Sequence, residues 1–133
     1  MDYGIALLLA GERALMKAAG EIARDHNLPV LAARVLITIR FQPGQSVNQL
    51  REQLDATTPT FARIIADLDK QGLVERRRSE HGDRRTRKLH LSHEGKRITD
   101  PATIAMRDRL RLAYRSAGSG AVAGARTVLE ALL

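Results

Sequence analysis

The 133-residue sequence contains no cysteine and no tryptophan, and aromatic residues make up only 3% of it. Without cysteine the chain has no disulfide framework, no thiolate zinc ligand and no cysteine nucleophile or redox sensor. The scarcity of aromatic rings disfavours binding of single-stranded nucleic acid by base stacking. The four histidines are scattered, and neither a phosphate-binding loop nor a carboxylate pair stands at a recognisable spacing. We therefore expect no enzyme, no cofactor and no metal site.

A hydrophobic run long enough to cross a membrane is also missing. The most continuous apolar stretch, at residues 5–10, is too short to span a bilayer. Asp2 stands where a signal peptide has a basic region, and charged residues follow the stretch at once. We expect a cytoplasmic chain without a membrane partner. Its length and its 44% hydrophobic content fit one domain with one core, over residues 1–133.

Positive charge is in excess and unevenly placed. Lysine and arginine outnumber aspartate and glutamate by 22 to 15, which gives a net charge of +7. Residues 1–71 are neutral, whereas residues 72–97 hold nine basic and four acidic side chains, a net charge of +5. A charge run of this kind is either a solvated loop or an element that contacts phosphates, and the surrounding pattern has to decide between them.

The first half of the chain has helical periodicity. Apolar residues recur at steps of three and four over residues 3–26, and residues 30–39 are apolar enough for a buried helix capped by Asn27. The letters SVNQ at residues 46–49 form a capping box, which predicts a helix over about 47–54.

A second short helix is predicted over about residues 58–71, with Thr58 as its cap and Pro59 in its first turn. Two short helices joined by a tight turn indicate a helix-turn-helix. The buried face of the second helix is marked by Phe61, Ile64, Ile65 and Leu68.

Gly72 ends this helix, and the periodicity then changes. Residues 73–78 and 85–91 are predicted as two strands joined by a polar turn. A basic hairpin directly after a helix-turn-helix is a wing, so the charge cluster falls on an element that would lie along a DNA backbone and minor groove.

Further helices are expected after the wing. Ser92 is predicted to cap the first of them, and the dipeptide at residues 100–101, Asp-Pro, is predicted either to kink that helix or to restart it as a helix over about 101–116. A break over residues 118–120 precedes a last short helix.

At this point the sequence resembles the multiple-antibiotic-resistance-regulator (MarR) family of winged-helix transcription factors. The resemblance rests on four segments and on their spacing. They are SVNQL at residues 46–50, the helix over 58–71 leading into GLVER at 72–76, DRR at 83–85, and LSHEG at 91–95.

The resemblance implies a mainly α (α+β) fold, a winged helix-turn-helix with N- and C-terminal dimerisation helices. Residues 28–97 would form the DNA-binding region, and residues 1–27 and 98–133 the dimerisation helices. The implied function is that of a homodimeric transcriptional regulator, a repressor, which binds double-stranded DNA at specific sequences. It would read a pseudo-palindrome with the helix over 58–71 in the major groove and the wing over 73–91 at the minor groove. The resemblance also admits a small-molecule effector, without identifying one.

The resemblance also assigns residues. Asp83 and Arg85 would shape the wing and Arg84 would be its tip arginine, although either arginine could enter the minor groove. Arg63 could read guanine, and Thr58 has a competing role as helix cap. The full predicted DNA-contacting set is Ser46, Asn48, Thr57, Thr58, Thr60, Arg63, Arg77, Arg84, Arg85 and Arg87.

Rival interpretations exist for several features. A winged helix can serve protein–protein contact, as an adaptor or antagonist of another regulator with little specific DNA binding; RNA binding is disfavoured because stacking aromatics are missing. His90 and His93 could hold a metal in principle, but ordinary polar or phosphate contacts fit their place better. Glu12 would flank its helix or pair with Arg13 or an arginine of residues 107–115 across a subunit seam.

Overall fold

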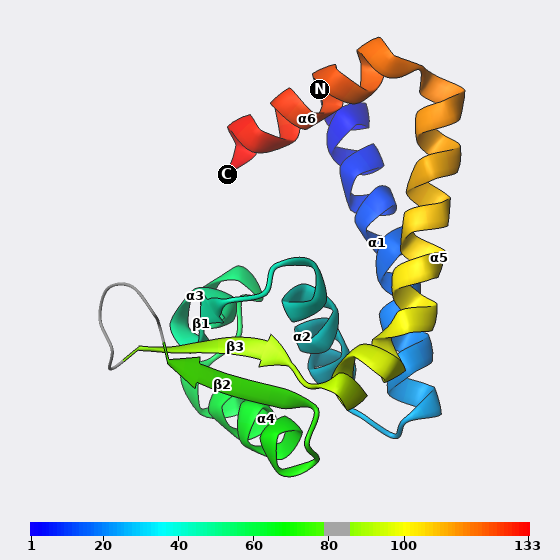
Figure 1. The fold of residues 1–133 in the computed structure, drawn as a ribbon. Coiled ribbons are helices and arrows are strands. Elements are labelled where there is room, and N and C mark those ends of the chain that lie inside the picture. Colours follow the sequence, from blue (N-terminus) through cyan, green and yellow to red (C-terminus); the bar gives the residue numbers. More distant parts are fainter. Residues whose placement is uncertain (79–85) are drawn as a thin grey trace.

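The computed structural model describes residues 1–78 and 86–133 of the chain. These residues form a mostly helical domain with a small antiparallel sheet, which confirms the predicted fold class (Figure 1). The elements in chain order are α1 (Asp2–Asp25), α2 (Val30–Phe41), β1 (Gln45–Ser46), α3 (Val47–Gln53), α4 (Thr58–Lys70), β2 (Val74–Arg78), β3 (Arg87–Leu91), α5 (His93–Ala117) and α6 (Ser119–Leu132).

Helix α2 lies at the centre of the core. It contacts α1 and α5 on one side and α4 and β3 on the other. Its apolar residues are so evenly distributed around the helix that most of its surface has to be buried, and Val35, Leu36, Ile37 and Ile39 are almost completely so. The helix therefore joins the winged helix-turn-helix to the long terminal helices.

The sheet has the order β1-β3-β2, and both pairings are antiparallel. In β3, Leu89 and Leu91 are buried, while Lys88 and His90 alternate with them on the other face, as the sequence predicts. Strand β1 differs from the prediction, because the sequence places its two residues in a turn and a helix cap.

The helix termini follow local sequence signals at most positions. Gly72, at a φ of +72°, ends α4 in a Schellman motif, in which Leu73 N–H donates to the Leu68 carbonyl over 3.0 Å. The predicted cap at Asn27 is wrong, since Asn27 has a φ of +52° and Pro29 occupies the N-cap of α2. The predicted restart at residues 100–101 is also wrong, because α5 continues through Pro101.

The terminal helices extend away from the winged part (Figure 1). Helices α1 and α5 lie side by side, and Gly118, at a φ of +87°, turns the chain into α6. Only the second half of α1 is buried, and α6 buries none of its residues. Within the single chain, Glu12 forms an ion pair of 2.8 Å with Arg34 of α2. In the two described ranges, no helix is both long and apolar enough to cross a membrane.

Candidate nucleic-acid interface

The turn between α3 and α4 is held by local hydrogen bonds. Asp55 adopts a φ of +51°, and its N–H donates to the Glu52 carbonyl. The half-buried Arg51 reaches over the turn and donates to the Ala56 carbonyl. The relative placement of α3 and α4, on which a helix-turn-helix depends, is therefore set by contacts within the motif.

Helix α4 has one buried and one exposed face. The buried face consists of the four residues that the periodicity predicts, Phe61, Ile64, Ile65 and Leu68. Arg63 is exposed on the other face and Thr60 is partly exposed beside it. The helix therefore presents a guanidinium and a hydroxyl to a partner, as a recognition helix requires.

The first turn of α4 corrects one prediction. Thr57, and not Thr58, occupies the N-cap, and the Thr57 side chain makes no capping hydrogen bond. Thr58 is the first helical residue and Pro59 follows it. Both threonines are exposed, so their hydroxyls are available to a partner at the N-terminus of the helix.

Ser46 and Asn48 differ in their surroundings. The Ser46 hydroxyl accepts from Gln49 N–H over 3.2 Å, and the Gln49 amide oxygen accepts from Ser46 N–H over 2.9 Å, which confirms the capping box. Asn48 is exposed on the first turn of α3. The structure thus gives Ser46 a structural role and leaves Asn48 free for contact.

Strands β2 and β3 form the described part of the wing, and like charges lie directly opposite each other in it. Arg77 is the register partner of Lys88, and Arg78 is the partner of Arg87. Like charges at directly opposed positions destabilise an antiparallel pair. Arg77 is partly neutralised by Glu75, to which its Nη2 donates over 2.9 Å. This end of the hairpin is therefore a place where a polyanion would relieve repulsion.

The strands of the wing run away from α1 and α5, so the Arg78–Arg87 end of the hairpin is its end farther from these two helices (Figure 1). Asp83, Arg84 and Arg85 lie outside the described residues. Lys88 was not among the predicted contacts, although strand alternation places it on the same face as Arg77 and could have identified it.

His90 lies on the outer face of β3, opposite Glu75. Burial lowers its pKa, as do the charges of Arg77 and Lys96, while Glu75 acts in the other direction. His93 is exposed at the start of α5. Among the described residues no group of three or more histidine, aspartate or glutamate side chains is arranged to hold a metal ion.

Comparison with known proteins agrees with this geometry. A family model described as "MarR family" matches residues 26–85. The HTH-type transcriptional regulator PetP of Rhodobacter capsulatus is 35% identical over 130 residues, covering 98% of this chain and 78% of PetP.

Two solved structures show the same fold. One is a MarR-family transcriptional regulator from Silicibacter pomeroyi, with a TM-score of 0.77 and 18% identity, covering 98% of this chain and 88% of that chain. The other is Streptococcus pneumoniae FabT in complex with DNA, with a TM-score of 0.66 and 20% identity, covering 98% of this chain and 92% of that chain.

Proposed function

The chain belongs to the MarR family of transcriptional regulators, which are DNA-binding proteins and not enzymes, and we propose that it is a homodimeric repressor that binds a pseudo-palindromic operator and occludes its promoter. The observation that carries the proposal is the opposition of Arg77 to Lys88 and of Arg78 to Arg87 in the wing. Such an arrangement costs stability in the free protein and becomes favourable when phosphates lie beside it.

In the proposed complex the winged helix-turn-helix over residues 28–97 reads DNA with two elements. Helix α4 enters the major groove, where Arg63 contacts a base edge and the threonines at residues 57, 58 and 60 contact phosphates or a thymine methyl group. The wing follows the backbone, and Arg84 or Arg85 enters the minor groove while Asp83 orients it. In this proposal the protein acts in the cytoplasm.

Homodimerisation is supported by an apolar groove between the terminal helices, residues 1–27 and 98–133. The groove has a volume of about 710 Å³. It is lined by Leu7, Leu8 and Leu15 of α1, Leu110 of α5, and Val128 and Leu129 of α6. On proteins in aqueous solution, large exposed apolar patches mark sites that bind another molecule. Since α6 buries no residue within its own chain, we infer that a second copy covers this surface.

The proposal is tested by fluorescence anisotropy on DNA from upstream of the protein's own gene, across a salt series. Neutralisation of several phosphates per dimer gives a steep fall of log affinity with log salt, at a slope of about −0.9 per phosphate contact. Replacement of Arg84 and Arg85 by alanine should weaken binding to all sequences alike. A flat salt dependence, or equal affinity for scrambled duplex, would contradict the proposal and favour a protein-interaction adaptor.

A further inference from the structure

Arg51 of α3 is joined to Ala56, on the far side of the turn between α3 and α4, by two hydrogen bonds. The Arg51 carbonyl accepts from Ala56 N–H over 3.3 Å, and the Arg51 Nη1 donates to the Ala56 carbonyl over 3.4 Å. One bond of this reciprocal pair comes from the backbone of Arg51 and the other from its side chain. Ala56 directly precedes Thr57, the N-cap of α4, so the pair holds the point from which α4 starts.

The start of α4 has no side-chain cap of its own among the described residues. The Thr57 side chain makes no capping hydrogen bond, and Pro59 in the first turn has no N–H to donate. Asp55, just before Ala56, has a φ of +51°, which lies in the left-handed region that favours glycine. The direction in which α4 leaves the turn therefore depends strongly on the Arg51–Ala56 pair.

The surroundings of Arg51 satisfy its guanidinium poorly. The Arg51 side chain is only 26% exposed, and its Nε is buried without a hydrogen-bond acceptor in residues 1–78 and 86–133. Its ion-pair partner Glu52 lies 3.8 Å from Nη2 and is itself largely exposed. A buried donor without an acceptor and a weakly paired, half-buried charge both lower stability. An apolar side chain of similar length should therefore fit this place at least as well as arginine.

We propose that Arg51 is a positioning residue, which aims α4 for base-specific contact and whose presence lowers the stability of the free domain. Arg63, to which a base contact is assigned, lies about one and a half turns from the start of α4. A small change of direction at Ala56 displaces the Arg63 guanidinium, and a binding geometry has to be held to within about 0.5 Å. This inference rests on the proposed function, because it presupposes that α4 reads base edges.

A direct contact with a DNA phosphate is the other role open to a partly exposed guanidinium beside a helix N-terminus. In the structure the Arg51 Nη1 is already engaged by the Ala56 carbonyl and the Nε is buried, which favours positioning. The two roles differ in what they do to binding. A phosphate contact strengthens binding to every sequence and steepens the salt dependence, whereas positioning changes the preference among sequences.

The experiment compares two Arg51 variants with a matched control. Arg51→Met removes the charge and the donors but keeps a long side chain, and Arg51→Lys keeps the charge and a donor. Arg24→Met removes the same charge from an exposed position near the end of α1. Urea unfolding at matched protein concentration measures stability. Fluorescence anisotropy across a salt series measures affinity for DNA from upstream of the protein's own gene and for a scrambled duplex.

We expect Arg51→Met to unfold at the same urea concentration as the wild type or at a higher one. Its preference for the upstream DNA over the scrambled duplex should nevertheless fall by about tenfold or more, as the loss of one base contact implies. Its affinity for the scrambled duplex and its salt slope should equal those of Arg24→Met. Arg51→Lys should recover part of the preference, and Arg24→Met should keep all of it.

Three results would overturn the proposal. An unchanged preference in Arg51→Met would remove any positioning role. An equal loss on both duplexes, with a salt slope reduced by about one phosphate contact per subunit, would make Arg51 a phosphate contact. A lower urea midpoint in Arg51→Met would make Arg51 an ordinary stabilising residue of the turn.

Amide hydrogen exchange tests the positioning without DNA. The Phe61 N–H donates to the Thr57 carbonyl over 3.0 Å in the first turn of α4, and the Ala56 N–H belongs to the reciprocal pair. Both amides should exchange faster in Arg51→Met than in the wild type although the urea midpoint is not lower. If the wild type shows no preference for the upstream DNA, the proposed function fails, and exchange then decides the role of Arg51 in the turn. Unchanged exchange at both amides would overturn that role as well.

Discussion

A methyl group on the α-carbon of Gly95 would collide with the carbonyl oxygen of Leu73. The collision arises because the first turn of α5 lies directly against the start of β2. The Leu73 carbonyl accepts from Ser92 N–H over 3.1 Å, and the Ser92 hydroxyl donates to the Gly72 carbonyl over 2.6 Å while it also caps α5. The wing and the long helix are thus joined through backbone groups that cannot move independently.

Gly95→Ala should therefore destabilise the protein by about 2 kcal/mol, because the neighbour that must shift is backbone and not a flexible side chain. Urea unfolding at matched protein concentration measures the change. Gly20→Ala is the control, since no atom lies within 4 Å of a methyl group there and alanine is the better helix former, by up to about 1 kcal/mol. Equal stability of the two variants would show that α5 does not approach β2 as closely as described.

The capping box distinguishes a structural role from a proposed DNA contact at the start of α3. Ser46→Ala should cost about 1 kcal/mol of unfolding free energy, because the Gln49 N–H loses its acceptor. Asn48→Ala, on the exposed side of the same turn, should leave stability unchanged and weaken DNA binding. Thermal unfolding and anisotropy on the same samples test both. A loss of DNA affinity in the Ser46 variant without any loss of stability would make Ser46 a DNA contact.

Arg63 is the exposed residue of α4 to which the proposed function assigns a base contact. Arg63→Ala should relax base preference at one operator position, by about 1–3 kcal/mol if the contact to guanine is bidentate. Arg87→Ala, in the wing, should instead weaken binding to all sequences and reduce the salt slope by about one phosphate contact. Anisotropy against a set of single-base operator variants distinguishes the two. A uniform loss for Arg63→Ala would assign it to the phosphate backbone.

The regular parts of this fold could be predicted because their signals are local. The capping box at residues 46–49, the apolar face of α4 and the alternation in β3 each follow from a period or a cap. Strand β1 could not be predicted, since its two residues form a strand only through their pairing with β3, which lies more than 40 positions away in the sequence. The same holds for the pairing of Glu12 with Arg34, which joins residues 22 positions apart.

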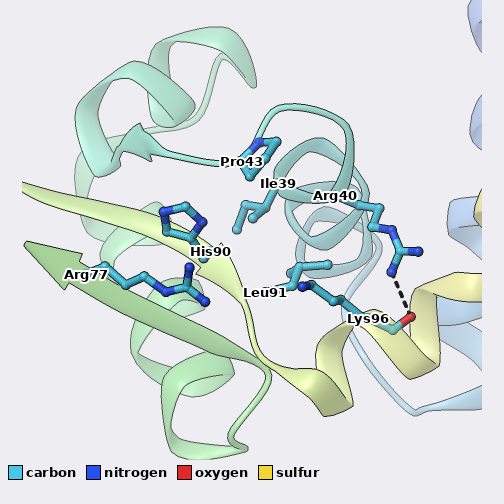
Figure 2. Close-up of a pocket in the computed structure, with 7 residues that line it drawn as sticks. All are labelled: Ile39, Arg40, Pro43, Arg77, His90, Leu91 and Lys96. Atoms are coloured by element: carbon cyan, nitrogen blue, oxygen red, sulfur yellow. Dashed lines mark hydrogen bonds between the residues drawn. The ribbon is translucent and has the colours of Figure 1, made fainter. Parts of the chain in front are cut away.

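The residues of the candidate site likewise divide into those that local sequence signals predict and those that only the fold brings together. The exposed residues of α4 and the basic strands were identified from spacing and charge. The cavity beside the wing was not, because its basic lining residues Arg40, Arg77, His90 and Lys96 come from four separate elements and no sequence pattern relates them (Figure 2). Thr58 was misassigned as a cap because helix starts that contain two consecutive threonines fit either residue equally well, and only the backbone distinguishes them.

His90 predicts a dependence of stability on pH. Its pKa in the folded protein lies below the ordinary value of 6.5, chiefly through burial. As the pH falls, the unfolded chain therefore takes up this proton before the folded protein does. The stability that neutral His90 contributes is complete above pH 6.5 and is lost as the pH falls through the pKa of the folded protein. From pH 7.5 to pH 5, the unfolding free energy of the wild type should therefore fall relative to that of His90→Gln. A constant difference over that range would contradict the prediction.

The surface of α6 tests the proposed dimer. Leu129 lines the apolar groove and is about half exposed in the single chain, so Leu129→Glu should place a charge inside the proposed interface. Thr127→Glu, on the opposite side of the same helix turn, is the matched control. Light scattering should find twice the 14.7 kDa chain mass for the wild type and the control, and the single-chain mass for the Leu129 variant. Because the proposed operator is a pseudo-palindrome bound by two subunits, the Leu129 variant should also lose operator affinity while each chain stays folded. A wild-type protein that is monomeric at micromolar concentration would contradict both the dimer and the proposed mode of operator binding.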